Sequence, residues 1–274
     1  MSRELHPRGP RNTGRVILIG AGPGDPELMT IKAVRALSSA DVILHDDLVN
    51  PEILQWAKPQ ARIVAVGKRG GCRSTPQEFI IRLAESEARK GHVVARLKGG
   101  DPLLFGRGGE EWQALIGSGI EVEVISGISA GVAAAASAGI SLTHRDHSQG
   151  VILITGHGKH GAEPAWDQLA RTGLTLVVYM GVARATAIRD ALIGGGMAGS
   201  TPVAIIQNAS LPNERTVRDT LGRFPEAMAA SGIGSPAIIV IGDVADARMA
   251  LAHAPASVSD VDYADRLARL TDRR

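Results

Sequence analysis

Two apolar runs that stop in turns of glycine, aspartate and proline constrain the fold of this chain most strongly. The first is Val16–Asp25, which reads VILIGAGPGD, and the second is Leu97–Phe105, which reads LKGGDPLLF. Apolar runs bounded in this way are typical of buried strands that end in tight turns. Ligands of open parallel sheets bind where such strand ends meet. Because both turns fall in the first half of the chain, we expect them to build one site.

The first turn contains the beginning of a dinucleotide-binding fingerprint. Gly20 and Gly22 follow a predicted strand, but Asp25 stands where the third glycine belongs. Pro23 has no backbone N–H to give to a phosphate, and a carboxylate at the start of the following helix would repel one. The turn therefore favours a ligand that approaches the glycine backbone closely and has no phosphate.

Strand-like and helix-like segments alternate along the chain. In the first half, strands are expected at 15–19, 42–44, 62–66, 92–97 and 122–125, with helical segments between them. This alternation implies parallel βαβ units with both sheet faces covered. The pattern restarts with strands at 151–155, 174–179, 203–207 and 237–241. We therefore predict an α/β protein of two α/β domains with mostly parallel sheets, at 15–127 and 128–247, joined near 126–150 and flanked by tails at 1–14 and 248–274.

Composition and charge exclude several function classes. The net charge is +2 and aromatic residues make up 3% of the chain, which argues against nucleic-acid binding. A single cysteine, Cys72, excludes an internal disulfide and fits a reducing compartment. The N-terminal residues lack the apolar segment of a secretory signal, and the small apolar run Ala130–Ile140 is too short to cross a bilayer. We expect a cytoplasmic protein without a membrane partner.

Polar side chains gather where the predicted strands end. Asp46 ends a buried strand, where a carboxylate could act as a general base, although aspartate is also an ordinary turn residue. Lys68 ends the next strand and could pair with Asp46, or it could be a surface lysine. The basic residues of these turns suit a polycarboxylate or phosphate substrate, with solvated loop charges as the alternative. They are Lys68, Arg69, Arg73, Arg107 and Arg145.

Two histidine pairs have a spacing that could suit a metal ion. They are His144 with His147 and His157 with His160, and both lie in glycine-rich loops. Neither pair is completed by a cluster of cysteine or glutamate. We therefore expect no metal site in this chain.

Several of these turns together resemble one family, the tetrapyrrole methylases. The matching stretches occur in the family's order and cover about Arg15 to Val244. Two of them, 96–111 and Thr143–Asp146, are specific to the members that methylate uroporphyrinogen III. The matching stretches are 20–32, 46–49, 66–69, 96–111, 127–130, 138–146, 155–157 and 179–181.

The resemblance implies S-adenosylmethionine as methyl donor, bound in a folded shape in a cleft between two α/β domains, and usually a homodimer. It places the family's proton acceptor on Asp46 and its proton donor on Lys68. Arg69, Arg107 and Arg145 would then meet the substrate carboxylates. The implied donor-site residues are Pro23, Gly99, Gly100, Asp101, Leu104, Ser129, Ala130, Met180, Ala209 and Ala237.

The reaction implied by the resemblance is two successive methyl transfers to carbons 2 and 7 of uroporphyrinogen III. The products would be precorrin-2, which serves sirohaem or cobalamin synthesis, and S-adenosylhomocysteine. His45 stands where the family often has tyrosine, and Ala209-Ser210 stands where a Gly-Thr pair is common. The alternatives are another precorrin methylase, the diphthamide-pathway methylase, a nicotinamide-dependent dehydrogenase that uses Gly20 and Gly22, and a tetrapyrrole carrier without catalysis.

Overall fold

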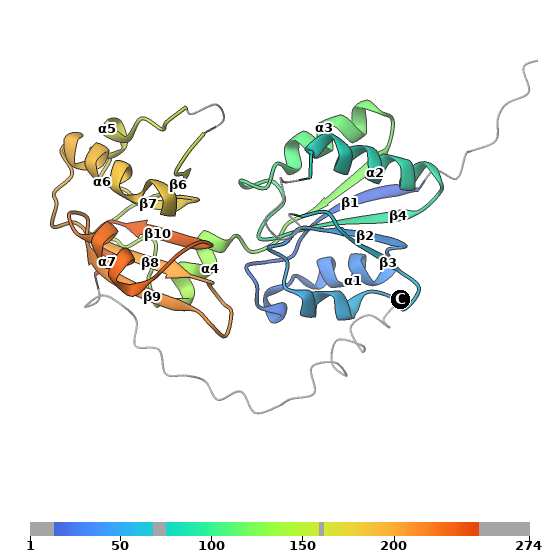
Figure 1. Cartoon of the computed structure of the whole chain (residues 1–274), viewed down its shortest axis with the longest axis horizontal. Helices are drawn as coiled ribbons and strands as arrows, with labels where there is room; N and C mark the ends of the chain where they lie inside the picture. The colour runs from blue at the N-terminus through green and yellow to red at the C-terminus, as the bar shows by residue number, and fades with distance from the viewer. Residues whose placement is uncertain (1–13, 68–74, 159–161, 247–274) are drawn as a thin grey trace, which may run out of the picture. The chain divides into compact units, whose positions relative to one another are not determined.

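The chain divides into two compact units, Met1–Ser129 and Ala130–Arg274, in a computed structural model that describes residues 14–67, 75–158 and 162–246 (Figure 1). Within the described residues, each unit is built around one five-stranded sheet. Several predictions fall outside the described residues: the tail 248–274, the tail 1–14 except Gly14, and Lys68, Arg69, Cys72, Arg73 and His160.

The sheet of the first unit is entirely parallel in its described pairings. Its strands lie in the order β3-β2-β4-β1-β5, so the strand order reverses around β1 and β4. Parallel neighbours need crossover connections, which the predicted alternation of strands and helices supplies. The parallel α/β prediction is confirmed for this unit. The strands are β1 (Arg15–Gly20), β2 (Val42–His45), β3 (Arg62–Ala65), β4 (Val93–Lys98) and β5 (Glu121–Ile125).

Helices cover both faces of this sheet. On one face α2 and α3 pack against Val16, Leu18 and their neighbours on β2 and β4, and α1 packs against β1 and β4 as well. Ile17 and Ile19, which point to the other face, are also buried. The helical segments are the 3₁₀ turn η1 (Pro26–Leu28), α1 (Ile31–Ser39), the 3₁₀ turn η2 (Pro51–Trp56), α2 (Gln77–Arg89) and α3 (Gly108–Gly117).

The helical spacing of the apolar residues in 26–38 predicts one helix, but the structure has two elements there. Thr30 interrupts them with extended backbone, and its hydroxyl accepts a hydrogen bond from the Ala33 N–H at 3.2 Å. This is the usual side-chain cap of a helix N-terminus, so α1 begins one residue later.

The second sheet differs from the expected parallel one. Its strands lie in the order β6-β7-β10-β8-β9, and only β6 and β7 are parallel. β10 runs antiparallel to β7 and β8, and β9 is antiparallel to β8. The short connection between β8 and β9 permits a hairpin and no crossover. The strands are β6 (Val151–Thr155), β7 (Thr175–Tyr179), β8 (Pro202–Gln207), β9 (Arg215–Thr220) and β10 (Ala237–Ile241).

Helices also cover both faces of the second sheet. Trp166, Ile188, Leu192, Phe224 and Met228, from α5, α6 and α7, form one core with the strands. α4 packs against β7 and β10, where the Gly131 N–H donates to the Tyr179 hydroxyl at 2.9 Å. No helix among the described residues is both long and apolar enough to cross a bilayer. The helical segments are α4 (Ala130–Ser137), α5 (Trp166–Leu169), η4 (Val182–Arg184), α6 (Ala185–Gly194), α7 (Phe224–Ser231) and η5 (Asp243–Ala245).

Candidate functional site

The glycine turns after β1 and β4 meet, as the sequence predicts. Gly22 and Gly100 exchange two backbone hydrogen bonds, at 3.2 Å and 2.6 Å, and both have positive φ angles of 75° and 67°. A Cβ on Gly20 would lie 2.4 Å from the Gly127 nitrogen, and one on Gly127 would lie 2.3 Å from the Gly100 oxygen. Three chain segments therefore approach one another at backbone distance, which only glycine permits.

Asp101 ties the turn after β4 to the segment that follows β5. Its Oδ1 accepts a hydrogen bond from the Leu103 N–H at 2.8 Å, and its Oδ2 accepts one from the Gly127 N–H at 3.2 Å. The predicted donor residues of this unit all lie in the segments that follow β1, β4 and β5, at the carboxyl edge of the sheet. They are Pro23, Gly99, Gly100, Asp101, Leu104 and Ser129.

Asp25 accounts for the misfit to a dinucleotide motif. Its carboxylate accepts a hydrogen bond from the Glu27 N–H at 2.8 Å and caps η1. The end of this short helix, where a phosphate would bind, therefore already faces a carboxylate of the chain itself. This geometry disfavours the nicotinamide-dependent dehydrogenase.

Asp46 follows β2 at the same sheet edge and is held by two cations from β4. Arg96 Nη2 lies 2.5 Å from Asp46 Oδ1, and Lys98 Nζ lies 3.5 Å from Asp46 Oδ2. The Asp46 side chain is 30% exposed, whereas those of Arg96 and Lys98 are 3% exposed. The carboxylate is thus oriented from inside the protein and reaches solvent at its other side, the arrangement that a general base needs.

Glu111, in the first turns of α3, closes this group of charges from the helix side. Its Oε1 accepts from Arg96 Nε at 3.2 Å, Lys98 Nζ at 3.1 Å and Gln77 Nε2 at 2.5 Å. Glu111 is 1% exposed. We call Asp46, Arg96, Lys98 and Glu111 the charge cluster; its two positive and two negative charges balance.

Sequence reasoning did not identify Arg96, Lys98 or Glu111 as site residues. A signal was present, because Arg96 and Lys98 sit two residues apart in a strand that is flanked on both sides by other strands. Residues i and i+2 of a strand share one face. Two cations on one face of a buried strand require nearby anions, since unpaired buried charges are very costly.

Two of the arginines predicted to bind substrate, Arg107 and Arg145, lie in turns, and Arg69 is outside the described residues. Arg107 precedes α3 with a φ of 59° and pairs with Glu110 at 2.7 Å; the hydrogen bond to Glu110 raises the pKa of Arg107. Arg145 is exposed in the turn between His144 and Ser148, beside a pocket of about 290 Å³. Arg107 is therefore already neutralised by a neighbour, whereas Arg145 borders open space.

The predicted donor residues of the second unit gather at one edge of its sheet. Met180 follows β7, Ala209 follows β8 and Ala237 begins β10. The register pairs Ile238 with Tyr179 and Ala237 with Gln207, so these three strand ends are neighbours. The hydrogen bond from Gly131 to Tyr179 brings Ala130, at the start of α4, to the same edge.

This edge also contains unusual backbone conformations. Met180, Asn208 and Ser210 have positive φ angles of 55°, 53° and 66°. Such angles are uncommon for residues other than glycine. They cost free energy and cluster at ligand-binding sites, where the surrounding structure enforces them. The strain therefore marks the two turns that flank Ala237 as candidate binding turns.

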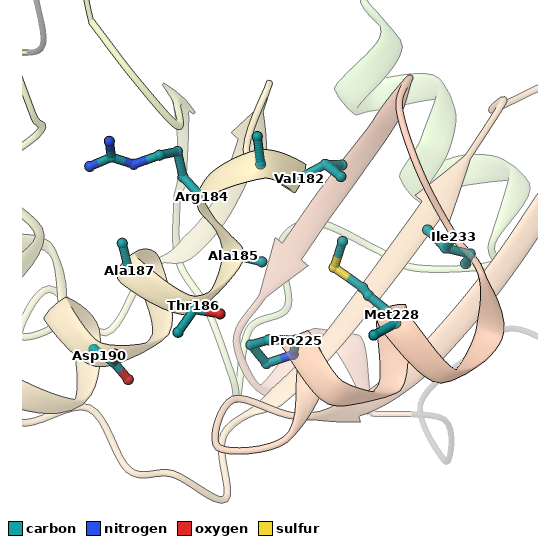
Figure 2. A pocket seen from close by; sticks show the side chains of 11 residues that line it. Val182, Arg184, Ala185, Thr186, Ala187, Asp190, Pro225, Met228 and Ile233 are labelled. Atoms are coloured by element: carbon teal, nitrogen blue, oxygen red, sulfur yellow. The ribbon is translucent and has the colours of Figure 1, made fainter.

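A larger cavity of about 650 Å³ lies elsewhere in the second unit, between η4 with α6 and the helix α7 (Figure 2). Its lining is mostly small and apolar, with Arg184 and Asp190 at the rim (Figure 2). It contains none of the predicted donor or substrate residues. Among the described residues, no group of three or more histidine, cysteine, aspartate or glutamate side chains could hold a metal ion.

Comparisons with known proteins agree with the geometry. The sequence profile of the Tetrapyrrole (Corrin/Porphyrin) Methylases matches residues 15–225. A uroporphyrinogen-III C-methyltransferase of Pseudomonas aeruginosa is 56% identical over 232 residues, which are 85% of this chain and 94% of that protein. Siroheme synthase 3 of Aeromonas hydrophila is 50% identical over 84% of this chain but only 49% of its own length.

Solved structures of similar fold point to the same family. The uroporphyrin-III C-methyl transferase of Thermus thermophilus, complexed with S-adenyl homocysteine, aligns with a TM-score of 0.72 and 41% identity over 84% of this chain and 98% of its own. Cobalt precorrin-4 methyltransferase aligns with a TM-score of 0.78 and 31% identity over 88% of this chain and 99% of its own. The chain therefore belongs to the tetrapyrrole methylase family.

Proposed function

We propose that this chain transfers two methyl groups from S-adenosylmethionine to carbons 2 and 7 of uroporphyrinogen III, giving precorrin-2 and S-adenosylhomocysteine. The observation that carries the proposal is the carboxyl edge of the first sheet. There a glycine-lined turn unsuited to phosphate lies one strand away from an oriented carboxylate, Asp46. The substrate is taken from the relatives named above, which match nearly the whole described chain.

In each transfer the bond between the sulfonium sulphur and its methyl carbon breaks, and a bond from that methyl to a ring carbon forms. The donor leaves as a neutral thioether, and the positive charge passes to the macrocycle. The ring then loses a proton, for which Asp46 is the proposed acceptor, and this balances the transfer. The family resemblance assigns Lys68 as a proton donor, a role that this balance does not require. Pyrrole carbons are already electron-rich, so holding the reacting atoms in line should supply much of the rate.

S-adenosylmethionine fits the observed turns for a physical reason. It carries a sulfonium and an adenosine but no phosphate, so it gains from close backbone approach and does not need a helix N-terminus. Gly20, Gly100 and Gly127 contact one another so closely that neither Gly20 nor Gly127 could carry a side chain. In the second unit we assign donor binding to the strained turns at Met180 and Ala209 and to Ala130 and Ala237.

The substrate has eight carboxylates, which arginine binds well because its guanidinium matches a carboxylate with two parallel hydrogen bonds. We assign Arg69, Arg107 and Arg145 to this task. Arg107 would have to exchange its ion pair with Glu110 for one with the substrate. We also propose that the protein is a homodimer and is cytoplasmic. Sedimentation equilibrium on the purified protein tests the dimer.

The direct test is to incubate the enzyme with isotopically labelled S-adenosylmethionine and uroporphyrinogen III under anaerobic conditions. Mass spectrometry then counts the labelled methyl groups in each macrocycle, and two are expected. An unmethylated macrocycle would refute the proposal. If uroporphyrinogen III stays unmethylated while a precorrin offered in a parallel incubation is methylated, the chain is another member of the family.

A further inference from the structure

The charge cluster contains more charge than a general base at Asp46 requires. A single partner would orient the Asp46 carboxylate, yet Arg96 and Lys98 both reach it, and both are nearly inaccessible to water. Removing such groups from water costs several kcal/mol for each charge, which their mutual attraction repays only in good geometry. The cluster therefore calls for an explanation beyond stability.

Glu111 is the member of the charge cluster that contacts both cations, Arg96 and Lys98. Arg96 contacts Glu111 with Nε and Asp46 with Nη2, so one guanidinium bridges the buried carboxylate and the exposed one. Lys98 does the same with its single ammonium group. Any shift of Glu111 is thereby passed to both cations that hold Asp46.

We propose that Lys98 and Glu111 are positioning residues for methyl transfer. Lys98 holds the Asp46 carboxylate directly, and Glu111 acts on that carboxylate through Arg96 and Lys98. The inference rests on the proposed function, in which Asp46 receives the ring proton. It adds two residues whose part in the reaction is to hold Asp46, Lys98 by direct contact and Glu111 through the two cations.

Two features separate this role from a purely structural one. First, Oε2 of Glu111 is buried and has no hydrogen-bond partner among the described residues. A buried polar oxygen left unpaired is destabilising, so the cluster is not arranged for maximum stability. Second, Asp46 is the one member of the cluster with a substantially exposed side chain, so the other three all act on the group that faces the site.

The chain offers a matched control in Glu87. This carboxylate is also buried in the first unit, at 3% exposure, and it is also surrounded by cations, Arg62 and Lys90. It lies at the end of α2, next to the residues that precede β4. Glu87→Gln therefore removes a comparable buried charge without touching the charge cluster.

The experiment compares Glu111→Gln, Lys98→Met, the double variant Lys98→Met/Glu111→Leu and Glu87→Gln with the wild type. Three quantities are measured for each: kcat for methyl transfer, the Kd for S-adenosylhomocysteine by calorimetry, and Tm. The ¹³C signal of the Asp46 carboxylate reports its surroundings independently of activity.

We expect Glu111→Gln and Lys98→Met to lower kcat by about 10- to 100-fold, because misplacement of a reacting group by about 1 Å has that effect. The Kd for S-adenosylhomocysteine should change less than about 2-fold, since the donor turns remain intact. The double variant should regain Tm, because neither charge is left unpaired, but its kcat should stay low. Glu87→Gln should lower Tm and leave kcat unchanged.

Wild-type kcat in Glu111→Gln, or an equal loss of kcat in Glu87→Gln, would overturn the inference and leave the proposed function standing. Absence of methyl transfer by the wild type would instead refute the proposed function. The ¹³C signal tests in either case whether Glu111 holds the Asp46 carboxylate in place. It should move in Glu111→Gln and stay in Glu87→Gln, and an unmoved signal in Glu111→Gln overturns the positioning role.

Discussion

The carboxyl edge of the first sheet and the edge of the second sheet around β7, β10 and β8 differ in the chemistry they present. The first contains the charge cluster, with Asp46 facing outward. The second presents Ala130, Met180, Ala209 and Ala237, none of which has an ionisable side chain, on turns with strained backbone. The comparison teaches a division of labour. We propose that the first edge supplies the oriented charge for the reaction together with part of the donor site, and that the second edge supplies the rest of the donor site through its backbone shape.

The strongest challenge to this division is Asp46→Asn. Loss of the proton acceptor should lower kcat by about 100- to 1,000-fold, while the Kd for S-adenosylhomocysteine stays near the wild-type value. Methyl transfer and calorimetric donor binding measure the two sides. Wild-type turnover in this variant would remove Asp46 from the mechanism and with it the special role of the first edge.

The glycine contacts of the first edge give the next largest effect. In Gly127→Ala the new Cβ would lie 2.3 Å from the Gly100 oxygen, so the turns must separate. We expect a loss of about 1–3 kcal/mol in the free energy of unfolding and a weaker Kd for the donor, both measurable by chemical denaturation and calorimetry.

Gly117→Ala is the control, because a Cβ at the end of α3 meets nothing within 4 Å. It should leave donor binding unchanged. If the two alanine variants bind the donor equally well, close backbone approach is not what the first edge provides.

Glu87 allows a comparison with Glu111 within the first unit, since both carboxylates are buried but Glu87 lies away from the charge cluster. The hydrogen bond from Lys90, followed by those from Arg62 and His92, lowers the pKa of Glu87 from 4.5 to about 2. A lowered folded-state pKa gives stability that is fully present above the unfolded value and is lost as pH falls through the folded one. The contribution of Glu87 should therefore fade between pH 4.5 and about 2.

Glu87→Gln should cost about 1–2 kcal/mol of unfolding free energy at neutral pH, reduced by the water around Arg62 and Lys90. Denaturation of both proteins from pH 7 down to acid measures the difference, which should shrink below pH 4.5. A difference that is constant across this range would mean that the charge of Glu87 contributes nothing.

The smallest expected effect concerns the strained turn at Met180. Glycine adopts a φ of 55° freely, so Met180→Gly should raise the unfolding free energy by up to about 1 kcal/mol. It should also weaken donor binding several-fold, because the side chain is 47% exposed and available to a ligand. A variant that is more stable and binds the donor normally would show that the strain serves another purpose.

Much of the fold follows from the sequence, and the exceptions have physical causes. Local sequence patterns, apolar runs that end in glycine turns, predict the strands and the meeting of the turns at Gly22 and Gly100. β9 was not predicted, because its residues Arg215–Thr220 include a single aliphatic side chain, Val217. Without β9 there was no hairpin to indicate that the second sheet is mostly antiparallel.

The site was predictable where backbone shape decides it and less so where charge pairing does. The predicted donor positions lie together at one sheet edge within each unit, and their role in donor binding stays a prediction. The partners of Asp46 were not predicted, because the strand and helix patterns do not say which polar side chains meet, and Lys98 fell outside the predicted strand 92–97. Which charges meet is decided by how α3 packs against the sheet, and no local pattern encodes that.

The division between the two edges is tested most directly by single-turnover methyl transfer, measured for Asp46→Asn and Met180→Gly over a range of donor concentrations. Saturating S-adenosylmethionine should restore the rate of Met180→Gly nearly to that of the wild type, while Asp46→Asn stays slow at every concentration. If saturating donor rescues Asp46→Asn and leaves Met180→Gly slow, the assignment of proton transfer to Asp46 and of donor binding to Met180 is wrong.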